Sequence, residues 1–120
     1  MSEKSYEEMV SEAKGRIREI TPREAITLRE QDGAVVYLDV REPQEWNLFR
    51  IPGAVHVPLS RVAQITPEQI ACDRQVILYC SRGNRSALAT DTMQQMGFTN
   101  VVSMAEGIMG WVNAGGAVEE

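Results

Sequence analysis

Short runs of apolar residues alternate along this chain with segments whose apolar residues recur every three or four positions. The clearest runs lie at 35–38 (VVYL), 75–79 (QVILY) and 101–104 (VVSM), with a briefer extended segment at 54–58. Short runs rich in β-branched residues are typical of strands that are buried on both faces. Because segments with helical spacing separate them, the pattern predicts an α/β domain with a mainly parallel sheet.

Capping residues mark where the predicted helices begin. Ser5 with Glu8, and Thr21-Pro22 with Glu24, have the spacing of helix N-termini in which side chains and backbone N–H groups bond reciprocally. The first pair predicts an amphipathic helix within residues 1–19, whose apolar stripe continues to Ile20. A later helix over 86–96 is expected to stop at Gly97.

A chain of 120 residues has room for one ordinary domain. We therefore expect two parts: the N-terminal helix, residues 1–19, and a domain of residues 20–120. The helix is interpreted as packing on the domain, with dimerisation through its apolar stripe as the alternative.

Charge and hydropathy exclude several function classes. The formal net charge is −5, whereas phosphate backbones need a basic face, so we expect no nucleic-acid partner. The apolar runs are too short for a membrane span, and the first twenty residues lack the apolar core of a secretory signal. Two cysteines without metal-ligand spacing predict neither a disulfide framework nor a metal site. These features together predict a cytoplasmic protein.

Cys80 carries the candidate chemistry. It follows the predicted strand 75–79 and precedes the helix 86–96, and ligands of parallel sheets bind at the carboxyl ends of strands. A helix N-terminus offers unpaired N–H groups and a positive dipole end, which favour an anion and the reactive thiolate form of cysteine. A cysteine in such a place is otherwise a small buried apolar residue.

The polar loop after Cys80 favours the chemical interpretation. Arg82 and Arg85 supply positive charge, while Gly83 and Asn84 tolerate the left-handed backbone that a tight cradle needs. Ser86 is placed to cap the helix or to hydrogen-bond to the sulfur. The candidate substrate-binding residues are the whole loop: Ser81, Arg82, Gly83, Asn84, Arg85 and Ser86.

At this point the chain resembles the single-domain rhodanese sulfurtransferases. The stretch 79–87 (YCSRGNRSA) is similar to the active-site loop of that family. Three further motifs occur in the family's order: 38–46 (LDVREPQEW), 51–59 (IPGAVHVPL) and 97–111 (GFTNVVSMAEGIMGW). The resemblance covers residues 20–111. It implies a rhodanese-like domain of about five mainly parallel strands flanked by helices, to which the N-terminal helix is an addition.

The resemblance also implies a two-step reaction. The Cys80 thiolate takes the outer sulfur of a small anionic donor such as thiosulfate, or of a persulfide, including one carried by a protein. Cyanide or a thiol then removes that sulfur from the Cys80 persulfide. No cofactor or metal is implied. One departure from the family stands before the Ile-Pro-Gly turn, where Phe49-Arg50 replace the usual Gly-His and are expected to alter one wall of the pocket.

Other polar residues are given mainly structural roles. Asp39 ends a strand at the same sheet edge as Cys80, so it either orients Arg85 or the loop, or pairs locally with Arg41. The spacing of Arg41 and Glu45 predicts an ion pair between them. His56 is interpreted as a structural residue.

Two alternatives remain beside sulfur transfer. The first is a catalytically weak rhodanese-type binding or sulfur-carrier module, which the presence of Cys80 disfavours. The second is a phosphatase or arsenate reductase. Those enzymes have five residues between cysteine and arginine, whereas Cys80 and Arg85 are separated by four. A shorter loop makes a tighter cradle, suited to a single sulfur atom rather than to a tetrahedral oxyanion.

Overall fold

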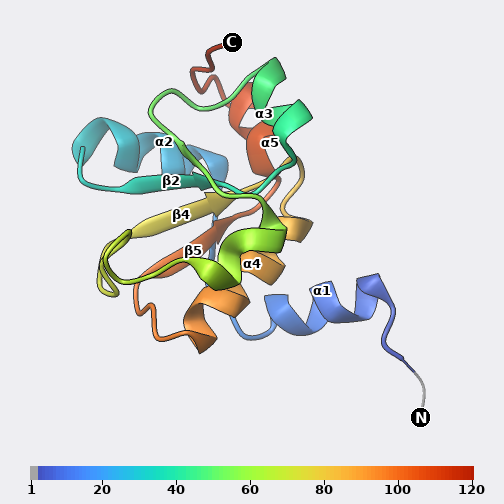
Figure 1. The fold of residues 1–120 in the computed structure, drawn as a ribbon. Coiled ribbons are helices and arrows are strands. Elements are labelled where there is room, and N and C mark those ends of the chain that lie inside the picture. Colours follow the sequence, from blue (N-terminus) through green and yellow to red (C-terminus); the bar gives the residue numbers. More distant parts are fainter. Residues whose placement is uncertain (1–2) are drawn as a thin grey trace.

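The computed structural model describes residues 3–120. Over that range five strands form one parallel sheet in the order β1-β5-β4-β2-β3 (Figure 1). The strands are β1 (Glu19–Ile20), β2 (Val36–Asp39), β3 (Val55–His56), β4 (Val76–Tyr79) and β5 (Val101–Met104). The predicted α/β class with a parallel sheet is confirmed.

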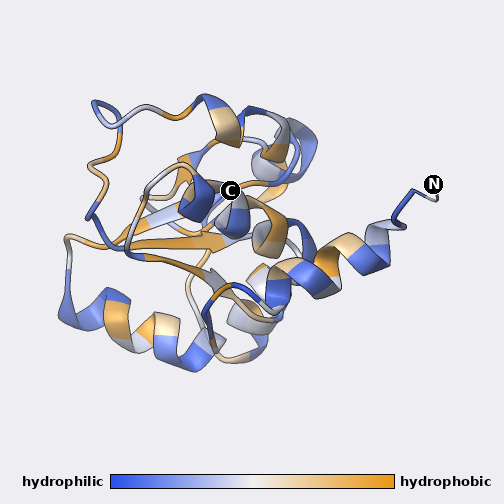
Figure 2. Cartoon of the chain, turned by 90° about the horizontal axis from the view of Figure 1, so that it is seen from below, coloured by the Kyte–Doolittle hydropathy of each residue, from blue (hydrophilic) through white to orange (hydrophobic). Residues whose placement is uncertain are grey.

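Helices cover both faces of the sheet. The α-helices are α1 (Tyr6–Lys14), α2 (Pro22–Gln31), α3 (Pro43–Leu48), α4 (Asn84–Gln95) and α5 (Gly107–Asn113), and a 3-10 helix η1 spans Leu59–Gln64. Helices α2 and α5 lie on one face, and α4 with η1 lies on the other (Figure 1). Figure 2 shows the central strands as apolar and the outer helices as mixed, which is the distribution that a two-sided core requires.

Strand β4 shows how the sheet directs side chains to the two faces. Val76 and Leu78 belong to the core beneath α4, and Ile77 and Tyr79 to the core beneath α2 and α5. Because side chains alternate along a strand, the next position, Cys80, faces α4. The strand therefore sets the direction in which the cysteine points.

The N-terminal helix is shorter than its apolar stripe predicts. Both predicted capping pairs are present, but α1 ends at Lys14 with Gly15 as its C-cap, and Glu19–Ile20 form β1. The prediction of helix up to Ile20 was wrong because Ile20 pairs with Met104 of β5 and buries its side chain in the sheet. Residues 1 and 2 of the predicted segment lie outside the described residues.

Helix α1 packs on the domain. Val10 and Ala13 are buried. Arg16, just beyond the helix, forms a bidentate salt bridge with Asp91 of α4, whose shortest N–O distance is 2.8 Å. Tyr6, at the other end of α1, lines the same small cavity as Asn84 at the start of α4. Helix α1 therefore runs beside α4 (Figure 1) and brings its first turn next to the loop that follows Cys80. From residue 3 onward, none of the helices has the length and hydropathy to cross a membrane.

Candidate functional site

The Cys80 thiol accepts two backbone N–H groups at the junction of β4 and α4. The residue is 1% exposed. Its Sγ accepts the backbone N–H of Gly83 at 3.1 Å and that of Ser86 at 3.4 Å, and the Ser86 Oγ lies 3.6 Å away. Cys80 thus lies between a strand and a helix N-terminus, where inward-facing backbone N–H groups favour a bound anion.

The glycine of the loop is required by its backbone. Gly83 has φ +100°, and a Cβ there would crowd the backbone N of Glu106 at 3.1 Å. This left-handed residue turns its N–H toward Cys80 and starts α4. Asn84, which the sequence assigned a similar freedom, is the first residue of α4 instead.

The turn into α5 supports the loop from behind, a feature that residue types alone did not reveal. The N–H groups of Ile108 and Met109 donate to the carbonyls of Cys80 (2.8 Å) and Ser81 (3.2 Å). Gly107, at φ +58°, touches the same peptide so closely that a Cβ would collide with the Ser81 backbone. Because the carbonyls of the loop bond outward to α5, its N–H groups are free to face the sulfur. Glu106-Gly107 lies within the motif 97–111 that carries the family resemblance, but the sequence did not assign it this contact.

Arg85 is held by a carboxylate from α3. Its Nη1 and Nη2 donate to Glu45 Oε1 and Oε2 at 2.6 and 2.9 Å, and the Ser81 hydroxyl donates to Glu45 Oε2 at 2.9 Å. Arg85 above all, with help from Ser81 and the Glu42 N–H, lowers the pKa of Glu45 to about 2, and in return Glu45 raises the pKa of Arg85. The guanidinium is thereby fixed in place at the mouth of the loop.

The predicted Arg41–Glu45 pair is wrong. The Arg41 side chain turns back to Asp39, which accepts its Nε and Nη2 at 3.1 and 2.8 Å, and both residues are buried. Arg41 also donates to the Phe49 carbonyl at 2.6 Å. With the Arg41 fork occupied, Glu45 is left to face Arg85.

Of the two roles predicted for Asp39, orienting Arg85 or the loop and pairing with Arg41, the structure shows the second. It binds Arg41 and does not contact Arg85. The pair braces the edge between β2 and α3, with the Arg41 guanidinium between the rings of Phe49 and Tyr79. Asp39 and Arg41 form a structural pair beneath the site.

The remaining loop residues differ in exposure. Ser81 and Arg85 are half-buried, whereas Arg82 and Asn84 are exposed. Arg82 therefore faces solvent, whereas Arg85 is held at the loop by Glu45. Within the described range, 3–120, no group of three or more His, Cys, Asp and Glu is arranged to hold a metal ion.

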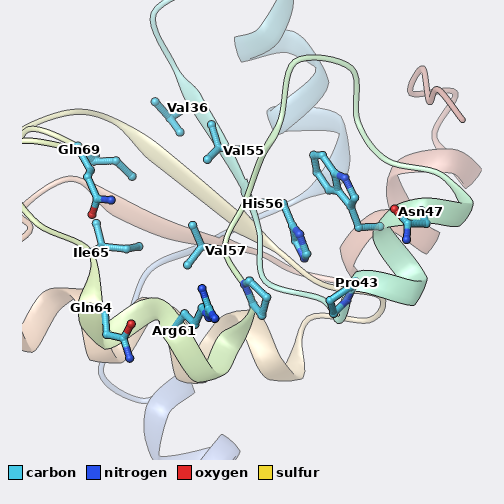
Figure 3. Close-up of a pocket in the computed structure, with 13 residues that line it drawn as sticks. Val36, Pro43, Asn47, Val55, His56, Val57, Arg61, Gln64, Ile65 and Gln69 are labelled. Atoms are coloured by element: carbon cyan, nitrogen blue, oxygen red, sulfur yellow. The ribbon is translucent and has the colours of Figure 1, made fainter.

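A groove of about 720 Å³ runs along edge strand β3, between α3 and η1 (Figure 3). Its lining includes His56, which stacks on Trp46 and bonds to the Arg41 carbonyl at 2.8 Å. Cys80 does not line this groove. Arg50 lies over the Trp46 ring and pairs with Glu119, so it ties α3 to the C-terminal tail. Phe49 and Arg50 do not line the groove themselves, and Arg50 reaches it only through its contact with Trp46.

The Glu45–Arg85 pair predicts a pH dependence of stability. The folded pKa of Glu45, about 2, lies below the ordinary value of 4.5. The pair therefore stabilises the fold above about pH 4.5, and that stabilisation is lost as the pH falls toward 2. Since both side chains are about 30% exposed, the contribution is about 1–2 kcal/mol rather than the full shift. Glu45→Gln should lower the free energy of unfolding by that amount at pH 7 and by much less near pH 2.

Urea titrations of wild type and Glu45→Gln at both pH values measure this difference. The matched control is Glu68→Gln, which removes an exposed carboxylate outside the loop around Cys80. An equal loss for Glu45→Gln at pH 7 and near pH 2 would mean that the ion pair contributes nothing to the acid dependence.

Comparison with known proteins identifies a domain family and several curated relatives. The model of the rhodanese-like domain matches residues 21–114. A thiosulfate sulfurtransferase, GlpE, of Pseudomonas syringae is 35% identical over 94 residues, which are 78% of this chain and 86% of that protein. A sulfurtransferase of Allochromatium vinosum is 33% identical over 81 residues, 68% of this chain and 75% of that one.

Other curated relatives are longer. The chain spans 24% of one from Mycobacterium tuberculosis, at 34% identity over 93 residues, and 44% of one from Bacillus subtilis, at 35% identity over 82 residues. Among solved structures, a protein of unknown function from Rhodopseudomonas palustris, described as a possible tyrosine phosphatase, superposes with a TM-score of 0.87. It is 30% identical, and the match covers 99% of this chain and 97% of that one. A thiosulfate sulfurtransferase from Pseudomonas aeruginosa has a TM-score of 0.83 and 25% identity, over 93% of this chain and 22% of that one.

Proposed function

Because the chain belongs to the rhodanese-like domain family, we propose that it transfers a sulfane sulfur from thiosulfate or a persulfide to cyanide or a thiol, through a persulfide on Cys80. One observation carries the proposal: the Cys80 Sγ lies within hydrogen-bonding distance of the N–H groups of Gly83 and Ser86. A loop of donors around one sulfur atom suits a sulfur nucleophile and the persulfide anion that it forms.

The reaction has two displacement steps. The Cys80 thiolate attacks the outer sulfur of thiosulfate, a new S–S bond forms, the old one breaks and sulfite leaves with its electron pair. Cyanide then attacks the outer sulfur of the Cys80 persulfide, thiocyanate leaves, and the thiolate is restored. A persulfide donor leaves as a thiolate, and a thiol acceptor leaves as a persulfide, with the same balance of charge.

We assign the binding of the anionic sulfur donor to the two arginines of the loop, Arg82 and Arg85. Arg85 is fixed by Glu45, so it presents its remaining N–H groups in one orientation, and the exposed Arg82 adds a second positive charge. Both stand beside the sulfur-binding loop, where a small anion such as thiosulfate has to enter. Arg82 and Arg85 outnumber the Glu45 carboxylate that holds Arg85, and this local excess of positive charge supports an anionic donor in a chain whose overall charge is negative.

The experiment that tests the proposal compares donors in one steady-state assay. Thiosulfate, mercaptopyruvate and a low-molecular-weight persulfide serve as donors with cyanide as acceptor, and an aryl phosphate is assayed in parallel. We expect turnover with a sulfane donor and no Cys80-dependent phosphate release, because the four-residue spacing from Cys80 to Arg85 leaves little room for a tetrahedral oxyanion.

The outcomes separate the alternatives. Phosphate release that depends on Cys80 and matches the sulfur-transfer rate would refute the argument from loop length. Loading of one sulfur without turnover for any acceptor would favour the sulfur-carrier alternative over an enzyme.

A further inference from the structure

Ser103 is a buried polar residue in an apolar strand. It lies in β5 between Val102 and Met104 and is 0% exposed. It stands beside Leu78 of β4, in the register that also places Cys80 at the end of that strand. A buried hydroxyl without a hydrogen-bond partner costs roughly 1–3 kcal/mol, so the Ser103 hydroxyl is expected to have one.

That partner is the hydroxyl next to the reactive sulfur. The Ser103 and Ser86 Oγ atoms are 2.8 Å apart, and the Ser86 Oγ lies 3.6 Å from the Cys80 Sγ. All three side chains are buried. The backbone of Ser86 is also held, since its N–H points to the sulfur and its carbonyl accepts the Thr90 hydroxyl at 2.7 Å.

The direction of these bonds depends on the charge of the sulfur. A Cys80 thiol can donate its proton to the Ser86 oxygen. A thiolate or persulfide anion has no proton to give, so the Ser86 hydroxyl must turn to donate to it, and the Ser103 hydroxyl then donates to the Ser86 oxygen. A chain of bonds that all point toward one anion is stronger than its separate members, above all where water is excluded.

We propose that Ser103 is a positioning residue for sulfur transfer, whose buried hydroxyl holds the Ser86 hydroxyl as a donor to the Cys80 sulfur. The inference rests on the proposed function, and it adds to the site a residue of β5 that does not touch the reacting atom. It also assigns a role to a polar side chain that the packing of the sheet does not require.

The test reads thiolate formation rather than turnover. In a Cys72→Ser background Cys80 is the chain's one remaining cysteine. The rate of its alkylation by iodoacetamide, measured against pH, reports the thiolate fraction. We expect Ser103→Ala to lower that fraction roughly three- to tenfold on the rising limb, the effect of one lost hydrogen bond. Ser103→Thr, which keeps the hydroxyl, should restore most of the profile. Circular dichroism checks that both variants fold.

A double-mutant cycle identifies the route. If Ser103 acts through Ser86, Ser103→Ala should have no further effect on the alkylation profile in a Ser86→Ala background. An equal shift in that background, or no shift in the wild-type background, would overturn the inference. Because alkylation needs no sulfur donor, its result stands apart from the assay of the proposed function: a protein without turnover still reports whether Ser103 stabilises the thiolate.

Discussion

Cys80→Ser should abolish both persulfide formation and sulfur transfer. The Cys80 sulfur accepts hydrogen bonds from the N–H groups of Gly83 and Ser86. A serine hydroxyl in its place is not ionised near neutral pH and cannot carry a sulfane sulfur. After incubation with thiosulfate, intact mass spectrometry of the wild type should show one added sulfur that disappears on addition of cyanide. The Cys80→Ser protein should show neither the added mass nor thiocyanate formation.

Cys72→Ser is the matched control, since it removes the only other cysteine of the chain. Cys72 lies before β4 and Cys80 after it, and both are free cysteines. This variant should keep near-normal turnover. A persulfide that forms in Cys80→Ser and is lost in Cys72→Ser would move the nucleophile to the other cysteine.

Arg85→Ala should cost about 2–4 kcal/mol of transition-state stabilisation, or roughly 30- to 1000-fold in kcat/KM for thiosulfate, the effect of losing one preorganised donor. The guanidinium is oriented by two bonds to Glu45 and by a weaker one to Ser81 at 3.3 Å. Arg85→Lys should recover only part of the loss, because a point charge does not reproduce the planar fork. Steady-state assays of the two variants measure the effect.

The charge of Glu45 has to be separated from the direct effect of Arg85→Ala on activity. In Arg85→Ala the Glu45 carboxylate loses its partner and adds a free negative charge beside the anionic donor. The double variant Glu45→Gln/Arg85→Ala removes that charge, so the activity it regains measures repulsion, and the activity still missing measures the direct role of Arg85. Arg82→Ala, an exposed arginine of the same loop, should have the smaller effect. Wild-type kcat/KM in Arg85→Ala would show that the assigned role is wrong.

Local sequence patterns were sufficient to predict the main strands, the helix starts and the loop around Cys80. Short apolar runs rich in β-branched residues, such as 76–79, favour strands buried on both faces, and the capping pairs at Ser5 and Thr21 act within four residues. The strand–loop–helix around Cys80 is local in the same sense. Its glycine, its helix start and its nucleophile lie within a few positions of one another, so their arrangement follows from short-range backbone geometry.

Partner choice was decided by the tertiary structure. Glu45 had a partner at helical spacing in Arg41, yet it binds Arg85, 40 residues away, because the Arg41 guanidinium is bound to Asp39. Strand β1 exists only through its pairing with β5: two residues have no strand pattern of their own, and the apolar spacing that led to Ile20 is equally compatible with a helix.

The same holds for the supports of the reactive sulfur. Ser103 and Gly107 lie more than twenty residues from Cys80, and nothing in their immediate sequence marks one as a hydrogen-bond partner of Ser86 or the other as a contact of the Ser81 backbone. Short-range steric preferences and hydrophobic burial specify helices, strands and the loop. Which polar groups meet across the sheet depends on the register of β4 and β5 and on the way α3 and α5 pack against their ends, and that is settled only when the whole core forms.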